Sequence, residues 1–270
     1  MSLYCIGEVR LQLSPAEADA SLAQAEQFHV SVGGHAALFC AEYARLGGHA
    51  VLLSQLGQDP FGQRIRNALA EQGVDVSRVR MVPGQTTPVL FADGSRPLAY
   101  HDAGLSFPPE DLDLGFLSDA SVLHFSTAGL LDGPARFTHL KAISAARDAG
   151  VPVSFAPCCA PSLWADAAFL RQTFFLFLPL ADFVFLTETD LEFLFDSSEL
   201  RTALFSLFTG HVQCVVCTGR QGTRLLTRNL LRQSAAVLPI ETVCATVLEQ
   251  FSSSGLSREK LPQWKPELLL

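Results

Sequence analysis

Residues 31–40, SVGGHAALFC, place a glycine pair and a histidine at the start of an apolar run that is typical of a helix. Glycines here let backbone N–H groups approach a ligand closely, and a helix N-terminus attracts anions. Gly33 and Gly34 could therefore hold a ligand, with His35 beside it. A tight turn from strand to helix requires glycines as well, and we interpret the pair first as such a turn.

A second group that could do chemistry is the sequence TETD at residues 187–190. Glu188 and Asp190 offer carboxylates that could bind a hydrated Mg²⁺ ion. Acidic residues in the first turn of a helix also stabilise the helix itself, because they face its positive end. Both interpretations, a magnesium site and helix stabilisation, remain open at this point.

The chain contains seven cysteines, an odd number, scattered through apolar segments. Cys214 and Cys217 have the spacing of a Cys-x-x-Cys metal or redox motif. On a strand, however, side chains three residues apart face opposite sides of the sheet, which favours two buried thiols. With no signal peptide apparent, this cysteine usage predicts reduced thiols in a cytoplasmic protein.

These residues must be positioned by elements that alternate along the chain. Helical stretches at residues 36–46 and 60–73 separate short apolar segments that predict strands, among them residues 3–9, 50–57, 181–187 and 214–219. Strands separated by helices of this length predict an α/β fold with a parallel sheet covered on both faces. The Asp93-Gly94 dipeptide interrupts this alternation within residues 87–102 and predicts a β-hairpin in a small flap.

The bulk composition limits the function. The chain has 270 residues, of which 49% are hydrophobic and 17% charged, and its formal net charge is −8. This length suits one large domain or two small ones. The acidic balance argues against nucleic-acid and anionic-membrane partners, and no apolar stretch is long enough to predict a membrane span.

Six segments occur in the order and at the approximate spacing found in one known family. They are VGGHAALFCAEYARLGG (residues 32–48), LGQDPFGQRIRNALAEQGVDVSRV (56–79), HFSTAGL (124–130), PVSFAPCCAPSLW (152–164), ADFVFLTETDLEFL (181–194) and VVCTGRQGTRLL (215–226). From its first strand to about Phe251 the chain resembles the ribokinase, or PfkB, family of carbohydrate kinases and is fructokinase-like.

The resemblance implies a three-layer α/β/α sandwich with a mostly parallel central sheet and a small β lid over a sugar site. It implies one domain over residues 1–270, with lid segments at about 11–32 and 86–103, and a homodimer joined through the lids. It also leads us to expect that the helices which normally end the family's fold are truncated here.

The resemblance further implies where catalysis would occur. In the family, an aspartate after a Gly-Ala-Gly turn deprotonates the sugar hydroxyl, and the N–H groups of that turn stabilise the transferring phosphoryl group. The matching stretch here is ETVCATV, residues 241–247. Val247 therefore stands at the position of the base, and a valine accepts no proton. The anion-hole positions become Cys244, Ala245 and Thr246.

Other family positions are also changed. The substrate-pocket positions implied by the resemblance are Gln12, Gly33, Gly34, His35, Leu38, Ala156, Cys158 and Ala160. The nucleotide-pocket positions are Thr187, Glu188, Asp190, Cys217, Gly219 and Gly222. The glycines match, whereas polar family residues are replaced, for example by Leu38 and Ala156. Glu188 and Asp190 are the residues left for Mg²⁺.

We therefore expect a kinase homologue that has lost phosphotransfer and binds a small molecule or a protein partner. The alternative is an active ATP- and Mg²⁺-dependent kinase for a fructose-like sugar, with a remodelled site. That alternative requires a substitute base, for which Asp190 and Glu241 are the acids near enough in sequence. A second alternative is a structural module that dimerises through its lid.

Overall fold

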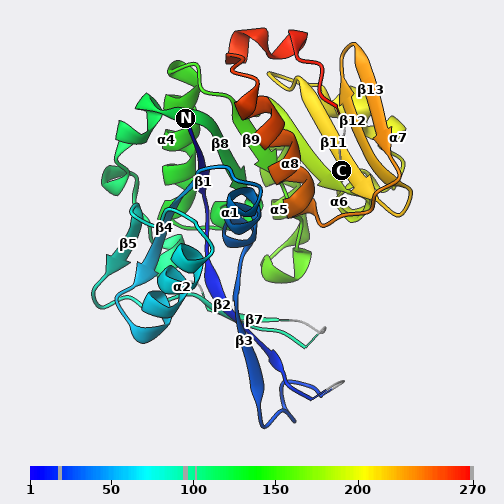
Figure 1. Cartoon of the computed structure of the whole chain (residues 1–270). Helices are drawn as coiled ribbons and strands as arrows, with labels where there is room; N and C mark the ends of the chain where they lie inside the picture. Colours follow the sequence, from blue (N-terminus) through cyan, green and yellow to red (C-terminus); the bar gives the residue numbers. More distant parts are fainter. Residues whose placement is uncertain (18–19, 94–96, 101, 268–270) are drawn as a thin grey trace.

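The computed structural model describes residues 1–17, 20–93, 97–100 and 102–267 (Figure 1). Its largest element is a nine-stranded sheet in the order β13-β12-β11-β10-β9-β8-β1-β4-β5. The strands are β1 (Ser2–Ile6), β4 (Ala50–Gly57), β5 (Val79–Val82), β8 (Ala120–Ser126), β9 (Val153–Ala156), β10 (Phe183–Thr187), β11 (Cys214–Gly219), β12 (Gly222–Thr227) and β13 (Leu230–Ser234). All neighbours from β5 to β11 pair in parallel.

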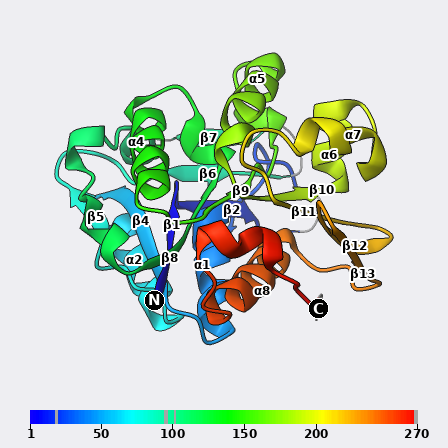
Figure 2. The same cartoon turned by 90° about the horizontal axis from the view of Figure 1, so that it is seen from above.

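Helices cover both faces of this sheet (Figure 2). One face carries α1 (His35–Arg45), α2 (Pro60–Glu71) and α8 (Ile240–Ser253), and the other carries α4 (Pro134–Asp148), α5 (Ala167–Phe177), α6 (Glu188–Phe195) and α7 (Leu200–Leu207). Successive strand residues supply the two cores in turn. In β10, Phe183 and Phe185 join the α1–α8 side, while Val184 and Leu186 join the α4–α7 side. The predicted three-layer α/β/α fold is confirmed.

Local sequence explains where the helices start. Asp59 precedes α2 and accepts a hydrogen bond from the Gly62 N–H at 2.8 Å, and Pro60 occupies the first helical position. In α6, Thr187 and Asp190 form a reciprocal capping box. These signals fix helices directly after strands, so their first turns lie at the carboxyl edge of the sheet.

A second sheet of four strands extends away from the main body at the bottom of Figure 1. Its order is β3-β2-β6-β7, formed by β2 (Arg10–Pro15), β3 (Phe28–Gly33), β6 (Val89–Phe91) and β7 (Leu98–Tyr100). The short helix α3 (Asp102–Leu105) follows β7. β6 and β7 pair antiparallel, as the hairpin prediction requires, although Gly94 itself lies outside the described residues. We call this second sheet the lid.

The edge of the main sheet differs from the alternating pattern. β12 and β13 add to β11 as an antiparallel hairpin extension, with no helix between them. The tight turn at its start depends on Gly222, which has a φ of +96°. Short 3₁₀ turns complete the described fold at Pro109–Asp111, Leu114–Ser118, Thr127–Leu130, Pro161–Leu163, Leu178–Leu180 and Arg258–Gln263. Within the described residues, no helix combines the length and hydrophobicity needed to cross a membrane.

Candidate functional site

Two cavities open where the carboxyl ends of the parallel strands meet. The first, of about 200 Å³, is lined by residues that follow β1, β8 and β9, together with the base of the lid. The second, of about 370 Å³, is lined by the ends of β10 and β11. Glu241 lines the first cavity and the preceding residue, Ile240, lines the second, so the N-terminus of α8 lies between them. This edge of an open parallel sheet is where such folds bind ligands.

A row of polar side chains forms one wall of the first cavity. Glu8, Arg10 and Gln12 line it at every second position, because alternate residues of an extended chain face the same side. Arg10 donates from Nη1 to Oε1 of Glu8 at 3.2 Å, and this carboxylate is almost fully buried. The Arg10 Nε is buried and has no hydrogen-bond partner among the described residues. Such a wall offers donors and acceptors to a hydroxyl-rich ligand.

The glycine pair beside this wall, Gly33 and Gly34, forms the tight turn from β3 into α1. Gly34 has a φ of +98°, and a Cβ there would lie 2.6 Å from the backbone oxygen of Glu8. Only glycine fits this position without strain. At Gly33 a Cβ would meet the movable amide of Gln12 at 3.0 Å. The turn places His35, the first residue of α1, against the cavity.

The other substrate positions are only partly brought together. Gln12, Gly34, His35, Leu38, Cys158 and Ala160 all line the first cavity. Gly33 and Ala156 do not line it, and Ala156 is completely buried at the end of β9. Leu38 remains 47% exposed, so this cavity has one apolar border that faces solvent.

A chain of hydrogen bonds runs beneath the first cavity. Ser154 Oγ lies 2.9 Å from His124 Nδ1, His124 Nε2 lies 2.9 Å from His35 Nε2, and His35 Nδ1 lies 3.2 Å from Glu241 Oε1. With Glu241 ionised, one proton arrangement satisfies every link, because each group then donates toward Glu241. Cys158 Sγ also contacts His35 Nδ1, at 3.2 Å.

Burial sets the protonation of these groups. It raises the pKa of Glu241, but the hydrogen bond and the electrostatic interaction with His35 outweigh burial and leave the pKa below its usual value. Glu241 is therefore a carboxylate at neutral pH. Burial, with an electrostatic contribution from the neighbouring His35, holds the pKa of His124 well below its usual value, so this ring is neutral. Burial also raises the pKa of the Cys158 and Cys244 thiols, which stay protonated.

The positions at which the resemblance puts the anion hole and the base lie within helix α8. The helix begins at Ile240, and the Val243 N–H already bonds to the Pro239 oxygen at 3.1 Å. Cys244, Ala245 and Thr246 lie in the helix interior, where backbone N–H groups bond to carbonyls one turn earlier. The N–H groups of α8 that have no carbonyl partner one turn earlier are those of its first turn, at residues 240–242.

The base position, Val247, points into the core. Its side chain is 2% exposed and packs in the core between α8 and the sheet, together with Cys244 and Leu248. Neither Val247 nor the three anion-hole positions lines either cavity. The acid that does face the first cavity is Glu241, six positions earlier.

The second cavity contains half of the expected nucleotide positions. Thr187, Glu188 and Gly219 line it, with Arg220 beside them. Glu188 Oε2 accepts a hydrogen bond from the Arg220 N–H at 3.0 Å. A Cβ at Gly219 would lie 2.0 Å from Glu188 Cδ, so the glycine makes room for this carboxylate.

The other three expected nucleotide positions, Asp190, Cys217 and Gly222, have structural roles. Asp190 is 2% exposed, and its two oxygens accept hydrogen bonds from the N–H groups of Cys159 and Thr187 and from the Thr187 hydroxyl. It caps α6, while Cys217 is buried and Gly222 makes the β11–β12 turn. Of the two expected magnesium ligands, Glu188 therefore fits the ion and Asp190 is already saturated. Magnesium keeps several waters and needs one or two carboxylates when phosphates supply the rest.

The cysteine pair on β11 behaves as predicted from strand geometry. Cys214 belongs to the core on the α1–α8 side of the sheet and Cys217 to the core on the α4–α7 side. Burial raises the pKa of both thiols, that of Cys217 to about 12. They share no site.

Two residues that line the first cavity, Arg10 and Glu241, were not identified as site residues from the sequence. Arg10 belongs to the alternating row Glu8, Arg10 and Gln12, a spacing that could have identified it. From the sequence, Glu241 is only one of two acids near enough to serve as a substitute base. The early start of α8, which turns Glu241 toward His35, has no clear sequence signal.

Comparison with known proteins now identifies the family. The family model described as "pfkB family carbohydrate kinase" matches residues 1–247. The chain is 28% identical over 233 residues to probable fructokinase-2 of Arabidopsis thaliana, an alignment that covers 83% of this chain and 70% of that protein. It is 31% identical over 195 residues to fructokinase-1 of Zea mays, covering 70% of this chain and 60% of that protein. The chain thus spans only part of the length of these relatives.

Solved structures agree on the fold. A PfkB protein from Polaromonas sp. JS666 superposes with a TM-score of 0.82 at 23% identity, covering 97% of this chain and 92% of that one. The fructokinase with bound ATP from Xylella fastidiosa gives a TM-score of 0.83 at 22% identity, covering 97% and 84%. The two-sheet architecture, the cavities at its carboxyl edge and the match over residues 1–247 lead to one conclusion: this chain belongs to the PfkB family of carbohydrate kinases.

Proposed function

We propose that this chain is an ATP-dependent carbohydrate kinase for a fructose-like sugar, in which Glu241 accepts the proton of the attacking hydroxyl. The observation that carries the proposal is the position of Glu241. It is ionised, it lines the first cavity, and it lies on the first turn of the helix that separates this cavity from the second. The fructokinase names of the relatives support the choice of sugar.

The neighbours of Glu241 favour it as the base over His35. Both ring nitrogens of His35 are engaged, Nδ1 by Glu241 and Cys158 and Nε2 by His124. His35 therefore orients the carboxylate through one of its oxygens, Oε1. A general base positioned in this way contributes a factor of roughly 10² to 10⁴ to the rate.

The other components of phosphoryl transfer lie nearby. The N-terminus of α8 would attract the charge of a phosphoryl group placed between the two cavities. Glu8, Arg10 and Gln12 would hold the sugar hydroxyls, and Arg220 would hold phosphate in the second cavity. Glu188 would hold Mg²⁺, which when bound neutralises phosphate charge.

The test is phosphate transfer from ATP to a panel of sugars, fructose first, measured by ADP release and by mass of the product. We expect multiple turnovers, and a loss of at least about 100-fold in kcat for Glu241→Gln. Glu249→Gln is the matched control, since it lies on the same helix and its carboxylate accepts a hydrogen bond from Ser253. Absence of any phosphorylated sugar, or full activity in Glu241→Gln, would overturn the proposal.

A second candidate function is binding of a small molecule, with a sugar as the first one to test, by a chain that has lost phosphotransfer, which is the expectation from the sequence. The specific observation in its favour is that Val247 is buried in the core and that the anion-hole positions lie inside α8. Calorimetric titration with the same sugars distinguishes the two functions. Saturable binding to a protein that gives no turnover would support the second function in place of the first.

A further inference from the structure

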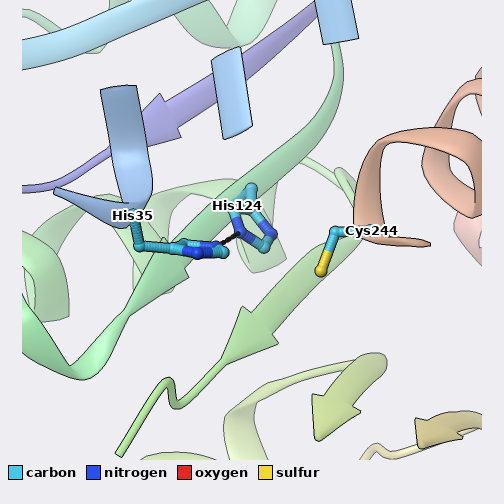
Figure 3. A group of neighbouring side chains, drawn as sticks. All are labelled: His35, His124 and Cys244. Atoms are coloured by element: carbon cyan, nitrogen blue, oxygen red, sulfur yellow. Dashed lines mark hydrogen bonds between the residues drawn. The ribbon is translucent and has the colours of Figure 1, made fainter. Parts of the chain in front are cut away.

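His35, His124 and Cys244 come together beneath the first cavity from three different elements, α1, β8 and α8 (Figure 3). One donor atom of each lies within 4.8 Å of the others, and all three side chains are buried. The proposed kinase reaction uses neither His124 nor Cys244. Two imidazoles and a thiol are a ligand set for transition metals and not for Mg²⁺, which prefers oxygen.

The two imidazoles are almost at the separation that a metal requires. His35 Nε2 and His124 Nε2 lie 2.9 Å apart. Two nitrogens bound to one tetrahedral Zn²⁺ ion lie about 3.3 Å apart, given Zn–N bonds of about 2.05 Å. A shift of roughly 0.4 Å therefore converts the hydrogen-bonded pair into a chelating pair.

The outer nitrogens of both rings already have the partners that metal-binding histidines use. His35 Nδ1 faces the Glu241 carboxylate at 3.2 Å, and His124 Nδ1 faces the Ser154 hydroxyl at 2.9 Å. Such partners fix the ring orientation and leave Nε2 for the metal. Cys158 contacts the outer side of the His35 ring, through Nδ1, so its sulfur does not compete for the metal position.

We propose that His35 Nε2, His124 Nε2 and Cys244 Sγ form a binding site for a Zn²⁺ ion that joins α1 and α8 to β8. The ion displaces the proton shared by the two rings, which moves to His124 Nδ1 and points at Ser154. The Cys244 thiol releases its proton to solvent. The thiolate and the nearby Glu241 carboxylate together balance the two positive charges of the ion, which a buried cation requires. Water from the adjoining cavity, which His35 lines, completes the tetrahedron.

Binding of Zn²⁺ by these three residues would not require kinase activity. Its test is calorimetric titration of Zn²⁺ into protein freed of metal, with far-UV circular dichroism on every variant. We expect one ion per chain and a loss of affinity of at least about 100-fold in Cys244→Ala. Cys214→Ala is the matched control, because Cys214 is equally buried in the same core but is not in the ligand group.

Cobalt gives a second readout. Co²⁺ bound by a thiolate produces a sulfur-to-metal charge-transfer band in the near ultraviolet. The band should be present in the native protein and in Cys214→Ala and absent from Cys244→Ala. If Cys244→Ala does not fold, Ser154→Ala replaces it, with affinity expected to fall about 10-fold or more because the partner of His124 is removed. Lack of stoichiometric Zn²⁺ binding, or binding unchanged in the folded variants, would refute the site.

Discussion

At the scale of single residues, the two adjacent glycines before α1 differ in what they tolerate. Gly34→Ala should lower the free energy of unfolding by about 2 kcal/mol, because the position has a positive φ and a Cβ there meets the backbone oxygen of Glu8. Gly33→Ala should cost much less, because its Cβ meets only side-chain atoms of Gln12, of which the nearest is the movable amide oxygen. Urea unfolding of both variants measures the difference. Equal losses would show that the turn does not depend on the conformation of Gly34.

Val247 gives a second prediction at this scale. Val247→Asp restores the residue type of the family base but places a carboxylate among the buried apolar side chains of the core. We expect a loss of stability of about 3 kcal/mol and no gain in phosphate transfer. Thr246→Asp is the control, since Thr246 is only half-buried and its substitution should lower the free energy of unfolding little. A stable Val247→Asp variant with increased turnover would mean that position 247 reaches the site.

His139 on α4 makes stability depend on pH. Burial lowers its pKa from 6.5 to about 4, although Nδ1 bonds to the Ala135 oxygen at 2.7 Å. Between these two values the unfolded chain binds the proton and the folded chain does not, so stability falls as pH falls from 6.5 to 4. His139 should account for a loss of about 2 kcal/mol in the free energy of unfolding between pH 7 and pH 5.

His139→Leu removes this titrating group. The loss of stability between pH 7 and pH 5 should therefore be smaller in the variant than in the native chain by that amount, as measured by urea unfolding at each pH. Some dependence should remain, because burial also depresses the pKa of His124. Identical pH profiles would show that His139 is protonated in the folded protein.

At the scale of elements, Asp190 tests whether an acidic residue at a helix start serves the helix or a metal. Asp190→Ala removes half of the capping box of α6 and leaves the half-buried Cys159 N–H without its acceptor. The free energy of unfolding should fall by about 2 kcal/mol. Glu192→Ala, on the exposed side of the same helix, should change it little. Unchanged stability of Asp190→Ala together with weaker Mg²⁺ binding would restore the metal interpretation.

The alternation of strands and helices was predictable because each element carries its own local signal. Short, continuous apolar runs mark the central strands, which are buried on both faces, and Asp59-Pro60 and Thr187-x-x-Asp190 mark helix starts. The β12–β13 hairpin was missed because the rule of alternating strands and helices applies to parallel pairs, and this edge is antiparallel. The start of α8 at Ile240 was missed because its cap, Pro239, makes no side-chain hydrogen bond that a sequence pattern could reveal.

The site was less predictable than the fold for a related reason. Matching the sequence to the family assigns a role to each position, here the anion hole and the base at residues 244–247. Because α8 begins at Ile240, these positions lie inside the helix and not at its first turn. Val247 is thereby buried and Glu241 is brought to the cavity. The contact between His35 and His124 joins residues 89 positions apart, so only the packing of α1 against β8 creates it.

At the scale of the whole molecule, the lid presents an apolar face that a second copy of the chain would cover. Leu13, Val89, Phe91 and Tyr100 line an apolar cavity of about 540 Å³ between this face and α2. Leu98 pairs with Phe91 on the same face and is 53% exposed, and Tyr100 is 61% exposed. Exposed apolar surface gathered on one sheet of a folded domain marks an association surface.

We therefore propose that the chain forms a homodimer through the lid. Light scattering after size exclusion should give twice the chain mass of 29.2 kDa. Leu98→Glu combined with Tyr100→Glu should return the protein to the monomer, because two charges on each copy would have to be buried in the interface. Phe205→Glu is the control, since Phe205 is 97% exposed on α7, an element of the main body, and should leave the dimer intact. A native chain that remains monomeric at high concentration would exclude the lid as a dimer interface, and dissociation by Phe205→Glu would move that interface to the face that bears α7.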